Sequence, residues 1–373
     1  MSRTRTLLQV LPDILTSSTG AGWVVEGVAK AMQARGWRVE QVSGGDLWPR
    51  GRGRMYFAVP LGLAHRARRA ARQLSLDGPC LVECHGFSAG LTAAHLRARR
   101  LPNVVTLFRC HGFWRAAVAL AAADDGNGAA PSTLRTFKSE LTYGSMERIG
   151  VRLSDIVVVQ NSADARFAEL VDGVPKDRLR VLAPGVAMPS VHRTPPRASM
   201  TTRILWVGRR SLVKGSDLLP EIARQLQESQ TPVQFELIGH DPRAFKSLPN
   251  VVVRPSMSRS DVAEAMGRAD VFLWTSRYEG FGLAPFEAMA HGIPVISARV
   301  GGMVDFLRDG ENGLEVTELS PATFVAAVRR FVALDATANE KLRSMARQSV
   351  VHLTWEHHAE LLEQFVEPIF SAL

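Results

Sequence analysis

Two glutamates, Glu279 and Glu287, lie eight positions apart in "SRYEGFGLAPFEAMAHGIP" (276–294), with glycine and aromatic residues between them. The preceding "VFLWTS" predicts a strand and "LAPFEAMAHG" predicts a helix, so the glycines lie in the connecting turn. The first N–H groups of a helix lack partners within it and bind anions readily. Gly280 and Gly282 would let a phosphate approach the backbone without a side chain in the way.

The two acids then have separate uses in a small-molecule site. Glu287, about one helical turn inside, is placed to accept hydrogen bonds from ribose hydroxyls, whereas Glu279 at the lip would meet whatever is attached to the far side of the phosphate. The alternative is a strand, a turn and an amphipathic helix with one acid on its solvated face. The remaining motifs decide between these interpretations.

An anion site also needs cationic side chains, and "WVGRRSLVKGSDLL" (206–219) supplies Arg209 and Lys214 directly after another predicted strand. This segment is not a Walker A loop, because Lys214 precedes Gly215 instead of following a glycine and preceding Ser or Thr. Taken alone it is equally well a solvated basic loop. Together with the glutamate segment, it indicates a phosphate site.

The chain resembles family 4 of the retaining glycosyltransferases, which have the GT-B fold. Residues 279–316, "EGFGLAPFEAMAHGIPVISARVGGMVDFLRDGENGLEV", resemble that family's nucleotide-sugar signature, and 206–219 resembles its Arg–Lys diphosphate loop. "TGAGWVVEGVAKAM" (19–32) resembles its N-terminal glycine loop, but Thr19 replaces the usual first glycine, so only Gly20 is carried over. "TWEHHAELLEQF" near the end resembles the helix that crosses back to the first domain.

The resemblance implies a role for each matched residue. Arg209 and Lys214 would hold the donor diphosphate and stabilise it as the leaving group. Glu287 would bind the ribose hydroxyls, and Glu279 would bind hydroxyls of the donor sugar. The assisting backbone N–H groups are those near Phe281, Gly282 and Leu283.

Two histidines compete for a place beside the transferred sugar. His111 in "TLFRCHGFWR" follows a predicted strand and matches the histidine that the family places there. His85 in "LVECHGF" also stands at a strand end and is the other candidate. An isolated histidine is more often structural than catalytic, and only the resemblance favours His111.

The predicted chemistry needs no metal and no cofactor. Fixed cations and a helix N-terminus aimed at the departing diphosphate stabilise its developing charge, and the sequence has no acid pair at a strand end suited to a divalent ion. Retention of configuration follows from the resemblance alone. The working mechanism is a front-face displacement in which the departing phosphate takes the proton of the acceptor.

The order of predicted elements gives an α/β fold with two Rossmann-like doubly wound domains facing across a cleft. Runs such as "TLLQVLP" and "CLVECHG" alternate with helical stretches such as "WVVEGVAKAMQARG", which implies parallel sheets. The pattern restarts at "RILWVG" after a proline-rich segment. The predicted parts are an acceptor-binding domain (1–186), a linker (187–201), a nucleotide-sugar-binding domain (202–350) and a closing helix (351–373).

Charge is unevenly distributed along the chain. Residues 1–190 hold 25 Lys and Arg against 15 Asp and Glu, whereas residues 191–373 hold 20 against 21. A basic half suggests an anionic partner, which could be a membrane surface, a nucleic acid or an acidic acceptor. Nucleic acid is disfavoured because no recognition motif accompanies the basic residues. A predicted helix in 61–76 carries four arginines suited to anionic lipid headgroups, the alternative being a solvated face: Arg66, Arg68, Arg69 and Arg72.

The sequence therefore predicts a metal-independent glycosyltransferase that uses a nucleotide sugar and a glycan, glycolipid or lipid-linked acceptor. No apolar run approaches the ~18 residues that span a bilayer. We expect a cytoplasmic protein, because free thiols suit a reducing compartment, and the four arginines would dock it peripherally on the inner face of the membrane. The three cysteines predict free, mostly buried thiols. The alternatives are a GT-B-fold sugar-nucleotide epimerase and a non-catalytic sugar-nucleotide-binding protein.

Overall fold

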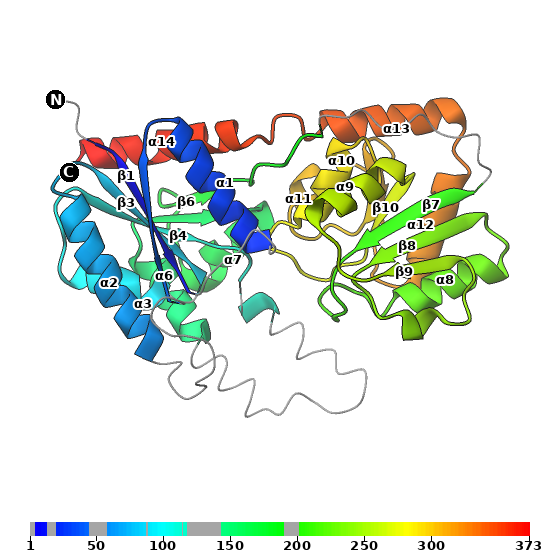
Figure 1. The fold of residues 1–373 in the computed structure, drawn as a ribbon, viewed down its shortest axis with the longest axis horizontal. Coiled ribbons are helices and arrows are strands. Elements are labelled where there is room, and N and C mark those ends of the chain that lie inside the picture. Colours follow the sequence, from blue (N-terminus) through cyan, green and yellow to red (C-terminus); the bar gives the residue numbers. More distant parts are fainter. Residues whose placement is uncertain are drawn as a thin grey trace. The chain divides into compact units, whose positions relative to one another are not determined.

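The computed structural model describes residues 4–12, 20–44, 58–86, 89–113, 115–117, 143–189 and 201–373. Contacts divide the chain into two units, one formed by Met1–Gly185 with Trp355–Leu373 and the other by Val186–Thr354. Each unit alternates strands with helices around a parallel sheet (Figure 1), which confirms the predicted α/β class. Most of the predicted linker, residues 190–200, lies outside the described residues.

The first unit has a six-stranded parallel sheet in the order β2-β1-β3-β4-β5-β6. Its described strands are β1 (Thr6–Leu11), β2 (Arg38–Ser43), β3 (Cys80–His85), β4 (Val104–Arg109), β5 (Ile156–Val159) and β6 (Leu179–Val181). Its described helices are α1 (Gly20–Ala34), α2 (Ala58–Leu74), α3 (Ala89–Ala98), α6 (Ser145–Leu153), α7 (Ser162–Asp172) and α14 (Trp355–Ser371).

The second unit has a six-stranded parallel sheet in the order β12-β11-β10-β7-β8-β9. Its strands are β7 (Thr202–Val207), β8 (Val233–Ile238), β9 (Val251–Arg254), β10 (Val271–Trp274), β11 (Val295–Ser297) and β12 (Gly313–Glu315). Its helices are α8 (Leu219–Glu228), η3 (Pro242–Phe245), α9 (Arg259–Arg268), α10 (Leu283–Ala290), α11 (Met303–Phe306), α12 (Pro321–Val332) and α13 (Ala336–Gln348).

Both sheets reverse their strand order once, and the position of this reversal predicts where a ligand would bind. In doubly wound sheets, ligands bind outside the carboxyl ends of the two strands that flank the reversal. In the first unit those strands are β1 and β3, and in the second they are β7 and β10. The predicted phosphate loop follows β7 and the glutamate segment follows β10, so the strand order brings the two motifs to one edge of the sheet.

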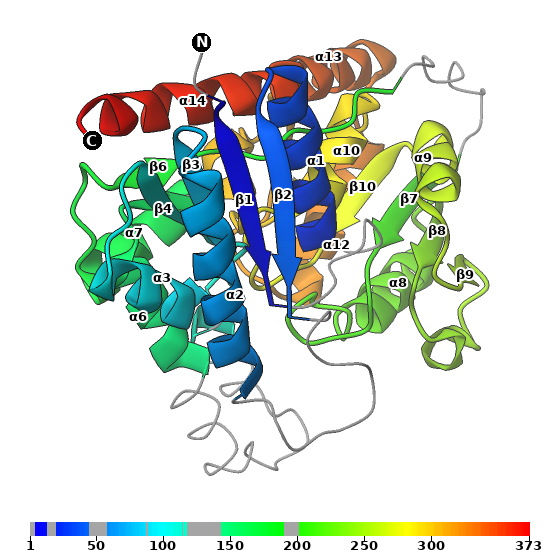
Figure 2. The same cartoon turned by 60° about the vertical axis from the view of Figure 1, so that its left-hand side comes forward.

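Helices cover both faces of the first sheet, and the two faces differ in character. Figure 2 shows β1 and β2 with α1 on one side and α2 on the other. On the α2 side, alternate strand residues such as Leu8, Val82 and Phe108 form one apolar cluster with Leu63 and Ala67 of α2. The alanine-rich side of this helix is therefore core. On the α1 side, the intervening strand positions include polar and charged side chains.

Local side-chain chemistry fits the elements around it. Asn161 caps α7 by accepting a hydrogen bond from the backbone N–H of Asp164. Ser258 caps α9 by accepting from the backbone N–H of Asp261. The three cysteines are free and buried. Among the described residues, no helix combines the length and the apolar character that crossing a bilayer would require.

Candidate functional site

Lys214 is held in place by neighbouring strands of the second sheet. The hydroxyl of Thr275, directly after β10, donates to the carbonyl of Lys214 at 2.8 Å, and it accepts from the indole of Trp206 at 3.0 Å. Gly215 has φ +60, and a Cβ there would lie 1.9 Å from the carbonyl oxygen of Thr275. The loop after β7 therefore packs directly against the end of β10, which only glycine permits.

The side chain of Lys214 reaches the first predicted glutamate. Its Nζ lies 2.5 Å from Oε1 of Glu279 and 5.2 Å from the ring centroid of Trp274. Ser276 also donates to the same carboxylate oxygen, at 2.8 Å. The structure thus joins two residues that are 65 positions apart in the chain. The carboxylate of Glu279 therefore balances the positive charge of Lys214. A bound diphosphate would interact with the same lysine.

Arg277 anchors the phosphate loop, a function that the sequence reading missed. Its guanidinium binds both carboxylate oxygens of Asp217 at 2.6 and 2.8 Å and donates to the carbonyl of Leu212 at 2.9 Å. Its backbone N–H donates to the carbonyl of Val213 at 2.8 Å. Such bidentate pairs are the strongest of the charged hydrogen bonds. The sequence contained one indication of this pair: an arginine two residues before Glu279 and an acid, Asp217, in the loop that carries Lys214.

Arg209, the second predicted phosphate ligand, is exposed. Within the described part of the chain it makes no hydrogen bond or ion pair. It stands directly after β7, five residues before Lys214, so both cations come from the same strand end. An exposed, unpaired guanidinium retains all its donors for a phosphate.

The glycine turn leads into α10 as the sequence predicts. Gly282 occupies the N-cap position with φ 84 and ψ 75, and no described side chain caps the first N–H groups of the helix. Phe281 is 3% exposed and stacks on Phe286 with ring centroids 4.1 Å apart. Only the backbone of Phe281 is therefore available to a ligand. The unsatisfied N–H groups that follow, beginning at Leu283, form the predicted anion-binding helix end.

Glu287 lies in the first helical turns of α10 and forms an ion pair with Arg259, the first residue of α9. The Glu287 side chain is 17% exposed, so its carboxylate is accessible. The sequence placed this acid correctly within a helix but did not identify its partner. A ribose diol would therefore meet a carboxylate already paired with a guanidinium.

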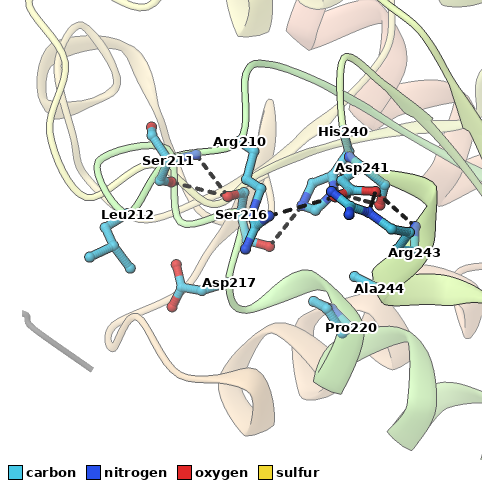
Figure 3. Close-up of a pocket in the computed structure, with 10 residues that line it drawn as sticks. All are labelled: Arg210, Ser211, Leu212, Ser216, Asp217, Pro220, His240, Asp241, Arg243 and Ala244. Atoms are coloured by element: carbon cyan, nitrogen blue, oxygen red, sulfur yellow. Dashed lines mark hydrogen bonds and ion pairs between the residues drawn. The ribbon is translucent and has the colours of Figure 1, made fainter. Parts of the chain in front are cut away.

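A cavity of about 760 Å³ lies beside this site, between the loops that follow β7 and β8 (Figure 3). None of the predicted site residues is among those that line it. Its polar groups are already paired with one another: Asp241 binds Arg243 at 2.7 Å, and His240 contacts the carbonyl of Ser216 at 3.2 Å. The predicted anion-site residues lie instead where the loop after β7 meets the end of β10. The lining residues are Arg210, Ser211, Leu212, Ser216, Asp217, Pro220, His240, Asp241, Arg243 and Ala244.

In the first unit, the two competing histidines are direct neighbours. Nδ1 of His85 lies 2.8 Å from Nε2 of His111, and their rings stack with centroids 5.1 Å apart. His85 ends β3 and is 1% exposed, whereas His111 follows β4 and is only partly buried. Gly20 is the first residue of α1 and is exposed, while Thr19 lies outside the described residues. The structure makes the histidines a pair where the sequence offered a choice.

A buried charged network lies behind this histidine pair, and the sequence reading missed it. Glu83 and Arg109 are both 0% exposed and form an ion pair between β3 and β4. Gln9 donates to Glu83 at 2.9 Å, and Nε2 of His85 lies 3.3 Å from the same carboxylate. Parallel strands covered on both faces have nearly continuous apolar sequences. An acid in "LVECH" and an arginine in "LFRCH" break this pattern, and they could have indicated a buried ion pair.

Electrostatics in this network favour a charged Glu83 and a neutral His111. Burial alone would raise the pKa of Glu83, but the Arg109 guanidinium above all holds that pKa well below its usual range. Burial lowers the pKa of His111 well below its ordinary value, and the nearby Arg109 guanidinium adds to this effect. At neutral pH, His111 is therefore an uncharged imidazole that can accept one hydrogen bond and donate another.

The network extends to α14 through His358, which is 2% exposed. Nη1 of Arg109 lies 3.3 Å from Nε2 of His358, and Nδ1 of His358 lies 2.8 Å from the carbonyl of Ala183. Because Arg109 donates, Nε2 must accept and the proton must lie on Nδ1. This hydrogen bonding connects α14 to the end of β4 in the same unit.

His358 should make the protein less stable in mild acid. Burial, reinforced by Arg109, lowers the pKa of His358 to about 3, whereas an unfolded histidine titrates near ~6.5. The unfolded chain binds this proton first, so stability falls as the pH is lowered between these two values. Linkage gives a loss of about 2 kcal/mol between pH 7 and pH 5 from this group alone.

Urea unfolding of the wild type and of His358→Gln at pH 7 and pH 5 measures this loss. The wild type should lose about 2 kcal/mol more than the variant over that interval. His357→Gln, which changes the adjacent exposed histidine of α14, is the matched control and should behave as the wild type. Equal losses in all three proteins would show that His358 does not titrate in this way.

Across the described ranges, no group of three or more His, Cys, Asp or Glu side chains is arranged to hold a metal ion. The predicted independence from metals and cofactors stays a prediction.

Comparisons with known proteins match both units of the chain. Residues 19–185 match the family model described as "Glycosyl transferase 4-like domain", and residues 201–333 match "Glycosyl transferases group 1". A D-inositol 3-phosphate glycosyltransferase from Acidothermus cellulolyticus is 29% identical over 239 residues, which cover 56% of this chain and 52% of that protein. The chain thus spans about half the length of this relative.

Solved structures share the whole fold. Sucrose-phosphate synthase from Thermosynechococcus elongatus superposes with a TM-score of 0.77 at 21% identity, covering 100% of both chains. Anabaena HepE in complex with UDP-glucose superposes with a TM-score of 0.68 at 15% identity, covering 99% of this chain and 100% of that chain. The predicted GT-B class of two Rossmann-like domains is confirmed, and the matches together support a glycosyltransferase family for this chain.

Proposed function

We propose that this chain is a glycosyltransferase that moves a sugar from a nucleotide-sugar donor to an acceptor bound by the first unit. The observation that carries the proposal is the contact between Lys214, on the loop after β7, and Glu279, after the neighbouring strand β10. Arg209 follows the same strand end and α10 begins just after Glu279, so we expect a diphosphate to bind here. The two glutamates beside it supply acceptors for hydroxyl groups. Phosphate and hydroxyl groups occur together in a nucleotide sugar.

In the proposed donor complex, each group has one task. Lys214 and Arg209 neutralise the diphosphate, and the N–H groups at Phe281, Gly282 and Leu283 donate to its oxygens. Glu287 accepts hydrogen bonds from the ribose hydroxyls, and Glu279 accepts them from the sugar. Lys214 is held in position before the reaction starts, so it can stabilise the charge that develops on the leaving group.

The proposed reaction retains the anomeric configuration and needs no metal or cofactor. The bond between the anomeric carbon and the phosphate oxygen breaks, and the acceptor oxygen bonds to that carbon from the same face. The acceptor proton passes to the departing phosphate, which carries both electrons of the broken bond. The resemblance to family 4 supports a role for His111 at the transferred sugar, with His85 as its hydrogen-bonded neighbour. The resemblance to family 4 supports retention, and the cations of the site replace a metal.

A panel of nucleotide sugars tests this proposal. The purified protein is incubated with each donor, without acceptor and with candidate glycan or lipid-linked acceptors, and nucleoside diphosphate release is measured. We expect slow hydrolysis with one donor class and faster release when an acceptor is present. Binding without any release would instead indicate a silent sugar-nucleotide sensor, and a reversible change in the donor alone would indicate an epimerase.

Replacing Glu279 and replacing Glu287 should affect the binding of different ligands. Glu287→Ala should weaken binding of the free nucleoside diphosphate and of the intact donor alike, because the ribose is present in both. Glu279→Ala should leave diphosphate binding nearly intact but weaken binding of the intact donor. Titration calorimetry with both ligands measures the difference. Equal losses for both ligands in both variants would mean that the two roles are wrongly divided.

We further propose that the protein works on the cytoplasmic side of a membrane, on a lipid-linked or membrane-proximal acceptor. Arg66, Arg69 and Arg72 of α2 are exposed, whereas Arg68 is half-buried and donates to the carbonyl of Arg99 at 2.5 Å. Three exposed arginines remain, each worth about 1 kcal/mol near an anionic surface. This attraction would support reversible docking and a role in polysaccharide biosynthesis.

Vesicle co-sedimentation checks this membrane contact. The protein should sediment with anionic vesicles, ignore neutral ones, and be released by high salt, because screening shortens the electrostatic range. Replacing Arg66, Arg69 and Arg72 with glutamine should abolish sedimentation. If the triple variant sediments as the wild type does, α2 is not the contact surface. If the wild type ignores anionic vesicles, a soluble acidic acceptor becomes the better explanation for the basic half.

A further inference from the structure

The buried chain Glu83–His85–His111 has a hydrogen-bonding direction that can be deduced from its partners. Glu83 accepts from Nε of Arg109 on one carboxylate oxygen and from Gln9 on the other. Nε2 of His85 lies 3.3 Å from the second oxygen without forming a hydrogen bond to it, but a lone pair on this nitrogen would be repelled by the ionised carboxylate, so the proton lies on Nε2. This places a proton on the His85 nitrogen nearest to Glu83.

The second step concerns the other nitrogen of His85. A doubly protonated His85 would put two buried cations, His85 and Arg109, against the single carboxylate of Glu83, and an unbalanced buried charge is costly. His85 is therefore neutral, and its Nδ1 carries a lone pair. His111 lies 2.8 Å away through Nε2, so Nε2 must donate to this lone pair. Nδ1 of His111 is then left unprotonated.

We propose that Glu83 and His85 fix the tautomer of His111, so that His111 presents Nδ1 to its ligand as a hydrogen-bond acceptor. His85 and Glu83 are positioning residues, because they act through His111. The ligand group that fits an accepting nitrogen is a hydroxyl donor, as on a sugar. A ligand carbonyl or ionised phosphate at that place would set its own lone pair against the lone pair on Nδ1. The two would repel each other, so such a group would not bind there. The catalytic meaning of this inference rests on the proposed function.

The same reasoning gives the opposite tautomer for His358, which shares Arg109 with Glu83. His358 carries its proton on Nδ1 because Nε2 faces the guanidinium and Nδ1 faces the carbonyl of Ala183. The network thus contains histidines in both tautomers, each set by a partner that can only donate or only accept. His358 is therefore an internal standard for a measurement of His111.

Nitrogen-15 NMR of the imidazole rings in the unliganded protein tests the proposal directly. The protein is labelled at its ten histidines, and spectra of His85→Gln and His111→Gln assign the two ring systems. Above neutral pH, we expect His111 to show a protonated Nε2 and an unprotonated Nδ1, with His358 showing the reverse. A wild-type His111 protonated on Nδ1 overturns the proposal.

Glu83→Gln should reverse the direction of the chain. The single oxygen of the introduced amide must accept from Arg109, so its NH₂ group replaces the oxygen that faces Gln9 and His85. Gln9 loses this acceptor and keeps its hydrogen bond to the carbonyl of Val25, while the new NH₂ group donates to Nε2 of His85. His85 then carries its proton on Nδ1 and donates to His111, whose own proton moves to Nδ1. We expect both rings to exchange their nitrogen signals while His358 keeps its pattern. Unchanged signals at His85 and His111 in the folded variant would contradict the relay.

Glu147→Gln is the matched control. Glu147 is also a buried glutamate of the first unit, paired with Arg115 at 3.1 Å, but neither residue contacts the histidine pair. This variant should leave the tautomers and the rate of sugar transfer unchanged, whereas Glu83→Gln should lower the rate by about tenfold or more, the cost of a wrongly directed hydrogen bond. The expected tautomers without any transfer would refute the proposed function alone. The opposite tautomer with active transfer would refute the relay alone.

Discussion

Replacing Lys214 with alanine is expected to lower the rate of sugar transfer by a few orders of magnitude. Lys214 is the cation that the loop after β7 and the end of β10 hold in place, through Thr275 and Glu279. Loss of one preorganised contact to a charged transition state costs about 3–4 kcal/mol. The variant also leaves the Glu279 carboxylate unbalanced beside the proposed diphosphate site. Steady-state rates of nucleoside diphosphate release, with donor and acceptor saturating, measure the effect.

Lys246→Ala provides the control for this change. Lys246 is an exposed lysine of the same unit, directly after η3, so its replacement alters the net charge equally without touching the site. It should transfer sugar at the wild-type rate. If Lys214→Ala also retains near-normal turnover, the lysine loop is not part of the mechanism. Activity lost equally in both variants would point to an effect of total charge.

Gly215→Ala is expected to lower both stability and activity. The added Cβ would lie 1.9 Å from the carbonyl oxygen of Thr275, far inside contact distance, and the residue has φ +60. The loop must move away from β10, which displaces Lys214 from Glu279. We expect a loss of about 3 kcal/mol in the free energy of unfolding, with turnover reduced as in Lys214→Ala. Urea unfolding and the release assay measure the two effects separately.

Gly173→Ala separates the backbone conformation from the close packing. Gly173 ends α7 with φ +68, but a Cβ there would meet no atom within 4 Å. This variant should cost only about 1 kcal/mol, the penalty for a left-handed non-glycine residue, and should keep full activity. If Gly215→Ala is no more destabilising than Gly173→Ala and remains active, the loop accommodates the added Cβ and close packing against β10 is not required.

The sequence by itself determined the local features of this protein. Runs of apolar residues ended at turn chemistry, so most strands of both sheets and their neighbouring helices were predicted. The two strands that were not predicted, β6 and β12, have three residues each, which is too short to show a period of two; of the strands this short, only β11 was predicted. Local sequence also indicated Gly282 at the start of α10 and the cap at Ser258. It further indicated that each loop of the predicted site follows the end of a strand. Such features depend on backbone conformations within a few residues.

Only the tertiary structure decided which strand ends meet. Lys214 follows β7 and Glu279 follows β10, and they touch because β10 lies beside β7 in the sheet. Strand order depends on crossover connections and on packing of the whole unit, which local periodicity does not encode. Had β10 paired with β9 instead, the same residues would have been too far apart to form one site.

Side-chain partners were decided at the same level. The sequence offered His85 and His111 as rivals, but the adjacency of β3 and β4 made them a hydrogen-bonded pair. The buried ion pair of Glu83 and Arg109 also exists because neighbouring strands turn both side chains to the face covered by α1 and α14. A charge can be buried only where an opposite charge meets it. That meeting joins residues 26 positions apart, so it is a property of the folded sheet and not of either strand.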